Sequence, residues 1–237
     1  MANILKNLII EQPRHKLIYL CRLIKSRMKS YCPLCCGIGD LYYNKPSRKF
    51  YLCERCGGMY VPNTFFPDSQ KEKDRYLEHN NDVNDPRYRA FVAPIANAVM
   101  NSFGEESKGL DFGAGTGPVV STILKENNYQ IELYDPFFHP HIHLLENTYD
   151  FIVSCEVVEH FFKPHKEFQL MKSLLKPHGK LFCMTGLYNN NIDFSTWQYK
   201  NDFTHVFIYQ QKTMEWIEEN FGFSGMEIDG NLVVFTA

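Results

Sequence analysis

A short glycine-rich loop constrains the fold of this chain more than any other feature. Residues 110–117 read as a buried strand that ends in an acid, followed by three glycines at alternate positions and then by the start of a helix. Such glycines let the backbone turn sharply and let a flat ligand approach it closely. A second apolar run ends at Asp135, 22 residues after Gly113, which is the spacing at which an acid meets the ribose of a nucleoside cofactor.

The acids around this loop argue against a pyrophosphate cofactor. The dinucleotide fingerprint G-x-G-x-x-G needs glycine at position 118, where this chain has Pro118. Asp111 lies directly before the loop and Glu156 opens a later one, so the expected floor of the pocket is acidic. Carboxylates repel phosphates but attract a cofactor that carries an ammonium and a sulfonium group. The arrangement resembles the S-adenosylmethionine (SAM) site of class I methyltransferases.

The resemblance implies an α/β fold with a Rossmann-like class I methyltransferase sheet, in which the last strand is antiparallel. Only 14 residues separate Asp135 from Asp150, which is barely room for a helix, a strand and two loops. We therefore expect the third strand and the helix before it to be shortened or absent. The hydrophobic patterns predict strands at 108–112, 131–134, 150–154, 180–185, 224–228 and 231–236, and helices at 117–127, 157–175 (interrupted at Pro164) and 211–221.

The same resemblance assigns roles to residues at the expected edge of the sheet. The glycines would admit the cofactor, Asp135 would bind its ribose, and Phe137 would either cover the adenine or belong to the core. Tyr76 and His79 precede the sheet, where such enzymes place a lid, although polar side chains on a helix can equally face solvent. The residues assigned to cofactor binding are Asp111, Gly113, Ala114, Gly115, Gly117, Asp135, Pro136, Phe137, Glu156, Tyr76 and His79.

Two C-x-x-C pairs predict a small zinc-binding unit before the α/β domain. Cys32 and Cys35 are separated from Cys53 and Cys56 by 17 residues, a spacing that lets four thiolates reach one tetrahedral Zn²⁺. The chain has eight cysteines and no secretory signal at its start, which indicates a reducing compartment and metal ligation rather than disulfides. Because four sulfur ligands close the coordination shell, this zinc is expected to fold the unit rather than to catalyse. Unmetallated buried thiols are the alternative.

Replacing Cys53 with serine removes one of the four expected ligands, so the Cys53→Ser protein should lose its stoichiometric zinc. Zinc is measured per chain by elemental analysis. The matched Cys36→Ser change, at a cysteine that breaks the two-residue spacing, should leave the zinc content unchanged. Full retention of zinc in the Cys53 variant would contradict the assignment.

A cluster of acids and histidines is expected after the strand at 150–154. Glu156, Glu159 and His160 lie at i, i+3 and i+4, so one helical turn would point all three to the same place, and His205 lies in a later loop at the same edge. This E-x-x-E-H pattern with a distant histidine resembles the metal sites of small-RNA 2′-O-methyltransferases and of ubiquinone-pathway O-methyltransferases. The resemblance implies a second divalent cation at Glu156, Glu159, His160 and His205.

Two alternatives to the cation stay open. His160 or His205 can act as a general base without metal, and these two histidines with Glu159 are the candidate catalytic residues. In the other alternative the set only caps a helix and lines the cofactor pocket.

Charge is distributed unevenly along the chain. Residues 1–60 carry 11 Lys and Arg against 3 Asp and Glu, whereas residues 61–237 carry 14 against 24. Residues 15–29 combine an apolar stripe at helical spacing with basic residues, which predicts an amphipathic basic helix. Such an arm can contact RNA, a membrane or an acidic partner, or can simply be solvated. No run approaches the roughly 20 apolar residues that span a bilayer, and we expect a cytoplasmic protein.

Residues 31–237 as a whole resemble a bacterial family of SAM-dependent class I methyltransferases with an N-terminal zinc ribbon. The resemblance rests on the paired cysteines, on the loop at 111–117 with Asp135, and on the segments 76–88 and 197–205. It implies an enzyme that transfers the sulfonium methyl group to a small-molecule acceptor, sugar-like or otherwise hydroxylated. An RNA methyltransferase that uses the basic arm, and a catalytically inactive SAM-binding interaction protein, are the alternatives. The expected segments are a basic amphipathic helix (1–30), the zinc ribbon (31–66), a helical cap or lid (67–104) and the methyltransferase domain (105–237).

Overall fold

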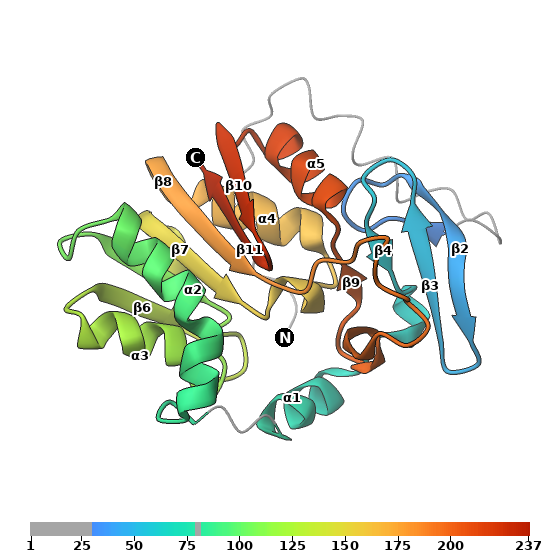
Figure 1. The fold of residues 1–237 in the computed structure, drawn as a ribbon, viewed down its shortest axis with the longest axis horizontal. Helices are drawn as coiled ribbons and strands as arrows, with labels where there is room; N and C mark the ends of the chain where they lie inside the picture. Colours follow the sequence, from blue (N-terminus) through green and yellow to red (C-terminus); the bar gives the residue numbers. More distant parts are fainter. Residues whose placement is uncertain (1–29, 79–81) are drawn as a thin grey trace.

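A six-stranded mixed sheet forms the centre of the part of the chain described by the computed structural model, residues 30–78 and 82–237 (Figure 1). The strand order is β10-β11-β8-β7-β5-β6. Strands β5, β6, β7 and β8 of this sheet are parallel, whereas β11 is antiparallel to both of its neighbours. This is the topology expected from the sequence. The strands are β5 (Lys108–Phe112), β6 (Gln130–Tyr134), β7 (Tyr149–Cys155), β8 (Leu175–Met184), β10 (Gly225–Asp229) and β11 (Leu232–Thr236).

Helices cover both faces of this sheet because alternate strand residues are apolar on both sides. Helices α2 (Pro86–Ser102) and α3 (Val119–Glu126) pack on one face, in a cluster that includes Phe151 and Val153. Helices α4 (Pro164–Ser173) and α5 (Gln211–Phe221) pack on the other face, in a cluster that includes Ile152. Neighbouring residues of β7 therefore point into different halves of the core.

The third strand, expected to be shortened or absent, is replaced by a 3₁₀ turn over Ile142–Glu146, so β6 is the edge of the sheet. One local expectation changes. The helix expected over 157–175 starts later, because Pro164 occupies its first turn and begins α4 rather than interrupting a longer helix. The residues before it form a 3₁₀ turn over Val158–His160.

A smaller five-stranded sheet holds the ribbon, residues 31–66. Its order is β1-β2-β3-β4-β9, and every neighbouring pair is antiparallel. The last of these strands lies almost 150 residues after β4 in the chain, so the sheet of the ribbon is completed by the α/β domain. The sequence does not indicate this link. The strands are β1 (Ser30–Tyr31), β2 (Ile38–Lys45), β3 (Arg48–Cys53), β4 (Met59–Tyr60) and β9 (Phe207–Ile208).

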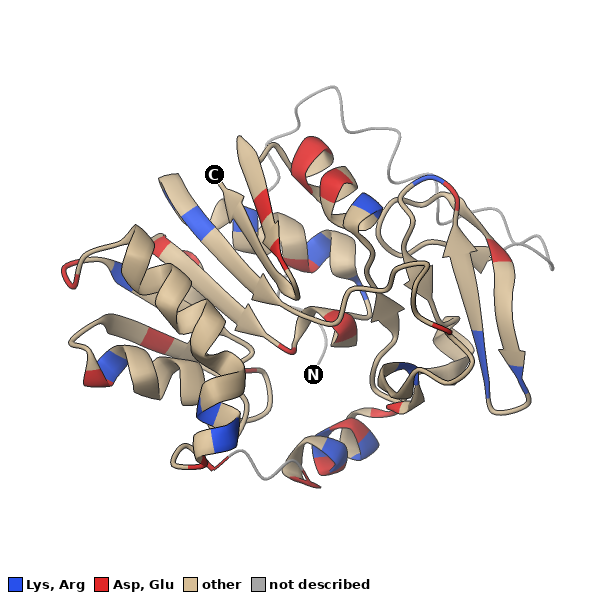
Figure 2. Ribbon diagram, in the orientation of Figure 1, with Lys and Arg blue, Asp and Glu red and all other residues tan. Residues whose placement is uncertain are grey.

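Helix α1 (Ser69–Glu78) lies apart from both sheets and carries basic and acidic residues along its length (Figure 2). None of its residues is buried. Helix α2 begins as expected, since the side chain of Asp85 accepts a hydrogen bond from the Arg87 amide and Pro86 is its first residue. The amphipathic basic helix expected at 15–29, with Cys21, lies outside the described residues. In the part of the chain that the structure describes, every helix is too short or too polar to cross a membrane.

The junction between the two sheets can be tested at Gly58. A Cβ atom at this position would lie 2.3 Å from Cζ of Phe207, whose side chain is fully buried in β9. We expect Gly58→Ala to destabilise the protein by about 1–3 kcal/mol, because the ring has to move within a packed core. The free energy of unfolding is measured by chemical denaturation. Gly225→Ala is the matched control, since nothing lies within 4 Å of its added Cβ. Equal stability of the two variants would contradict the packing at this junction.

Candidate functional site

A cavity of about 730 Å³ lies at the carboxyl ends of β5, β6 and β7, and Glu72 and Tyr76 of α1 line one side of it. This is the edge at which open α/β sheets bind ligands. Its lining includes all the residues that the sequence assigned to cofactor binding and catalysis, apart from His79, which lies outside the described residues. The assigned residues that line it are Tyr76, Asp111, Gly113, Ala114, Gly115, Gly117, Asp135, Pro136, Phe137, Glu156, Glu159, His160 and His205. Their roles in binding stay predictions.

The first two glycines of the loop adopt backbone conformations that favour glycine. The φ angles are +92° at Gly113 and +61° at Gly115. A Cβ at Gly113 would also lie 2.5 Å from the side chain of Val157. The amide of Gly113 donates to the carbonyl of Tyr134 at 2.8 Å, which ties the loop to the end of β6. The loop is thus held against the end of β6, and its backbone forms a cradle that lines the cavity.

Asp135 joins this cradle to the next loop. One carboxylate oxygen accepts a hydrogen bond from the Gly115 amide at 3.1 Å. The other accepts from the amides of Phe137 and Phe138 at 2.8 and 3.0 Å. The first oxygen keeps a lone pair that can accept from a further hydroxyl group, while the carboxylate holds both loops.

Asp111 supports the loop from below. It is buried, and the Ser121 hydroxyl donates to it at 2.5 Å. Burial raises the pKa of Asp111 to about 6, although the hydrogen bond from Ser121 opposes the shift. Burial thus favours the protonated form of Asp111, whereas the Ser121 hydrogen bond favours the carboxylate.

Glu156 differs from the expectation. Its φ angle is +53°, an uncommon value for a residue with a side chain, and its amide donates to the Met184 carbonyl at 2.8 Å. The chain turns sharply here and continues in a 3₁₀ turn, so Glu156 does not share one helical face with Glu159 and His160. Burial, followed by repulsion from Glu159, raises the pKa of Glu156 to about 9.

Three residues, rather than the four expected, form a group that could hold a metal ion. One ligand atom from each of Glu159, His160 and His205 lies within 4.8 Å of the others. Glu156 does not belong to this group. Two imidazoles and one carboxylate are a common donor set for divalent transition metals and zinc.

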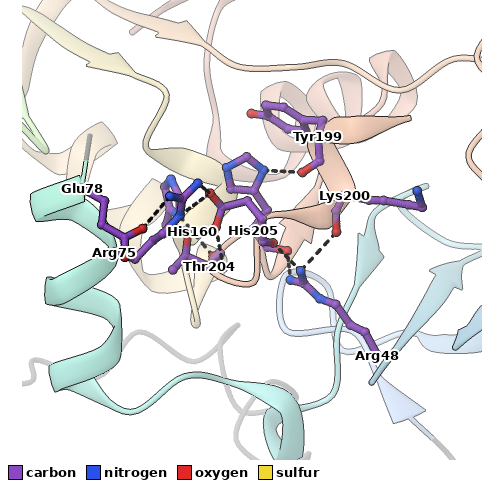
Figure 3. A network of polar contacts seen from close by, with 9 residues as sticks. Arg48, Arg75, Glu78, His160, Tyr199, Lys200, Thr204 and His205 are labelled. Atoms are coloured by element: carbon purple, nitrogen blue, oxygen red, sulfur yellow. Dashed lines mark hydrogen bonds and ion pairs between the residues drawn. The ribbon is translucent and has the colours of Figure 1, made fainter. Parts of the chain in front are cut away.

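Hydrogen bonds orient each member of this group. The carboxylate of Glu159 accepts from the Thr185 hydroxyl at 2.9 Å and from the Tyr199 hydroxyl at 2.6 Å. Nδ1 of His160 lies 3.1 Å from the Thr204 carbonyl, and Nδ1 of His205 lies 2.8 Å from the Tyr199 carbonyl (Figure 3).

These two contacts assign the tautomers of the histidines. A carbonyl oxygen can only accept, so Nδ1 must carry the proton in both neutral rings and Nε2 must carry the lone pair. Burial lowers the pKa of His205 to about 4, so this ring is neutral at physiological pH. In the neutral form of either ring, Nε2 therefore offers a lone pair to a metal ion or to a proton.

Several cavity residues were not identified from the sequence. Tyr88 and Phe91 follow the helical spacing of the buried stripe of α2, yet Phe91 is 45% exposed and both line the cavity. Glu72 of α1 also lines it and accepts a hydrogen bond from the Tyr76 hydroxyl at 2.9 Å. Tyr199 also lines the cavity, whereas Trp197 stacks on Tyr199, with ring centres 5.0 Å apart, and packs against the core cluster that contains Phe194.

The four cysteines of the ribbon form a second, separate group. All four are buried, and their sulfur atoms lie within 4.8 Å of one another. Cys32 and Cys56 are 3.6 Å apart, and Cys35 and Cys53 are 3.4 Å apart, close to the roughly 3.8 Å between ligands of a tetrahedral zinc with 2.3 Å bonds.

Matching turns surround the two cysteine pairs. The amide of Cys32 donates to the Gly37 carbonyl at 2.8 Å, and that of Cys53 donates to the Gly58 carbonyl at 2.9 Å. The exposed Cys36 stays outside the group, as its spacing predicts. The donor set therefore fits Zn²⁺.

Comparison with known proteins gives one family match. The family described as a methyltransferase domain matches residues 76–228, which is more than half of the chain. The comparison with curated proteins finds no match.

Solved structures share the fold at low sequence identity. The 1,6-didemethyltoxoflavin-N1-methyltransferase of Burkholderia thailandensis is 12% identical with a TM-score of 0.53, over 84% of this chain and 98% of that one. Phosphoethanolamine N-methyltransferase 2 of Haemonchus contortus is 17% identical with a TM-score of 0.51, over 70% of this chain and 45% of that one. Human N-acetylserotonin methyltransferase is 10% identical with a TM-score of 0.51, over 71% and 56%. This chain thus spans about half the length of the last two, and the likeness establishes the fold alone.

The role expected for Asp135 can be tested by binding. Asp135→Asn removes the charge but keeps the shape, and we expect the affinity for S-adenosylhomocysteine to fall about 10- to 100-fold, the value of one or two charged hydrogen bonds. Titration calorimetry measures the change. Asp193→Asn, at an exposed aspartate outside the cavity, should bind as the unchanged protein does. Unchanged affinity in the Asp135 variant would contradict a ribose contact.

Proposed function

The chain belongs to the family of methyltransferase domains, and on that premise we propose that it uses SAM to methylate a small hydroxylated acceptor in the cavity at the carboxyl ends of β5, β6 and β7. One observation carries this proposal: a single cavity joins the glycine cradle and Asp135 to the group of Glu159, His160 and His205. A donor and an acceptor can therefore lie side by side at one edge of the sheet. The sulfonium is already an activated methyl donor, so the main task of the protein is to align the two molecules and exclude water.

The lining of the cavity favours a small acceptor over a nucleic acid. Seven carboxyl side chains and one lysine line it, which is unfavourable for a polyanion. The Burkholderia enzyme is described in complex with 1,6-didemethyltoxoflavin, and the Haemonchus enzyme with phosphomonomethylethanolamine, both small molecules. Most of the basic residues that motivated an RNA substrate belong to residues 1–29, outside the described part of the chain.

Loss of a proton from the acceptor hydroxyl requires either a base or a cation. Nε2 of His205 carries a lone pair and can accept the proton directly. Alternatively, Glu159, His160 and His205 would hold a divalent cation, which would lower the pKa of the acceptor hydroxyl so that its proton could pass to water. In both cases Thr185 and Tyr199 keep the Glu159 carboxylate in place.

The ribbon cysteines would hold a structural zinc. Four thiolates complete the coordination of the metal and leave no position for a substrate. Its contribution is therefore to the folding of residues 31–66. This segment contains only short strands and one 3₁₀ turn, which provide little stability without the metal.

Methyl transfer is tested with SAM labelled in its methyl group and a panel of sugars and phenols. We expect His205→Gln to lower turnover of the best acceptor by about 10²- to 10⁴-fold, the usual effect of losing a general base. The affinity of His205→Gln for S-adenosylhomocysteine should stay within a few-fold of that of the unchanged protein. His143→Gln, at an exposed histidine outside the cavity, is the control. A His205 variant with full turnover would contradict a role in proton removal.

The choice between base and cation is tested with Mn²⁺ alone. If Glu159, His160 and His205 form a cation site, the unchanged protein binds Mn²⁺ in paramagnetic resonance titrations and loses turnover in a chelator that leaves the cysteine site loaded. Glu159→Gln should then weaken Mn²⁺ binding at least about tenfold, because a neutral amide replaces the anionic ligand. Full turnover without any added or bound cation at this group would leave His205 as the base.

A further inference from the structure

An arginine of the ribbon holds the segment that carries His205. Arg48, the first residue of β3, donates to the main-chain carbonyls of Lys200, Asp202 and His205 (Figure 3). The nitrogen–oxygen distance to Lys200 is 3.1 Å. Three carbonyls of one turn thus converge on a single guanidinium group, whose planar fork of donors suits such a cluster.

The turn held in this way carries three side chains of the cavity, Tyr199, Asp202 and His205. Inside the turn, Nδ1 of His205 donates to the Tyr199 carbonyl, so the orientation of the ring depends on where that carbonyl lies. The hydroxyl of Tyr199 also donates to Glu159. A shift of the turn would therefore move the imidazole and release the carboxylate at once.

The ribbon also holds the residues that follow His205. The amide of Val61 donates to the Val206 carbonyl at 2.9 Å, and Tyr60 pairs with Phe207 in the strand ladder. At the other end of β3, Cys53 is one of the four grouped cysteines. One short strand therefore connects the cysteine group to the turn beneath the cavity.

We infer that Arg48 is a positioning residue for the methyl-transfer site, through which the ribbon fixes the orientation of His205. The inference rests on the proposed function for the role of His205, but the geometry that it invokes lies entirely within the described residues. Arg48 does not itself line the cavity, and it contacts the lining residues Asp202 and His205 only at their main-chain carbonyls, so it acts through the turn and not on a ligand. The ribbon is then a structural part of the active site, because it supports the segment that carries His205.

Three variants test this role. Arg48→Met removes all the donors and keeps an apolar stem over Phe50, on which the guanidinium now lies with its carbon 5.0 Å from the ring centre. Arg48→Lys keeps a charge and part of the hydrogen bonding. Lys49→Met, at the next residue of β3, is the matched control, because the structure records no hydrogen bond or ion pair for the Lys49 side chain with any described residue.

Two measurements report on the turn without an acceptor. In the unchanged protein, nitrogen-correlated NMR of the imidazoles should show His205 as the Nδ1–H tautomer, with its signal assigned by the His205→Gln variant. Arg48→Met should mix the two tautomers and speed amide exchange in 198–206 by at least about tenfold, since the loss of charged hydrogen bonds lowers the cost of local opening. For both measurements, Arg48→Lys should give values between those of the unchanged protein and those of Arg48→Met. Lys49→Met should match the unchanged protein.

Two further measurements separate this inference from the proposed function. The affinity of Arg48→Met for S-adenosylhomocysteine should stay within a few-fold of that of the unchanged protein. With any acceptor that is turned over, kcat of this variant should fall by a larger factor than KM rises. If S-adenosylhomocysteine does not bind the unchanged protein, the proposed function fails whatever Arg48 does. If it binds, but the tautomer and amide exchange of the turn are the same in Arg48→Met, the positioning role is wrong. Loss of cofactor binding and of the whole fold in both Arg48 variants would also contradict it, since Arg48 would then serve overall stability.

Discussion

The pairing of β4 with β9 is the contact on which the rest of the arrangement depends. It makes a strand of the α/β domain complete the sheet of the ribbon, through Met59 with Ile208 and Tyr60 with Phe207. The apolar residues around it are continuous, because one core cluster contains the four ribbon cysteines together with residues of α4, α5 and the large sheet. A unit as small as the ribbon buries little surface alone, so this shared core supplies stability that the metal ligands would otherwise have to provide.

The pairing of β4 with β9 also positions the residues just before β9 at the edge of the large sheet. The residues just before β9 are Asp202 to Val206, and their main chain is held by the ribbon on one side and by the Val206–Glu159 hydrogen bond on the other. His205 is therefore fixed by contacts from two parts of the chain that are far apart in sequence. Preorganisation of this kind is what alignment of a donor and an acceptor requires, because small displacements of a reacting group cost large factors in rate.

Local patterns predicted most of the large sheet. The strand at 108–112 and the helix at 211–221 have the expected bounds, because each is set by a run of apolar residues with clear ends. The paired cysteines and the residues of the glycine loop also come together as their spacing suggests. In each case the information lies within a few residues of the site.

The features that the sequence did not predict depend on contacts between distant segments. No local pattern tells a two-residue strand at 207–208 to pair with residue 60, and Arg48 resembles any other arginine of a hairpin. Glu156 fits a helical spacing, but its φ is positive and its amide bonds to Met184 at the end of β8, so it lies outside the group of Glu159. Phe91 fits the spacing of the buried residues of α2, yet it is 45% exposed and lines the cavity.

Helix α1 completes the cavity under a different constraint from the sheets. It buries none of its own residues, and it contacts the rest of the site through the Arg75–Asp202 ion pair at 2.8 Å and through the ring of Tyr76, which lies 5.2 Å from that of His160 and 5.9 Å from that of Phe137. Side-chain contacts rather than a buried apolar face therefore hold α1 at the site. Tyr76 and Asp202, which make these contacts, also line the cavity. The site thus combines a floor fixed by long-range strand pairing with one side that is held by an ion pair and by aromatic contacts.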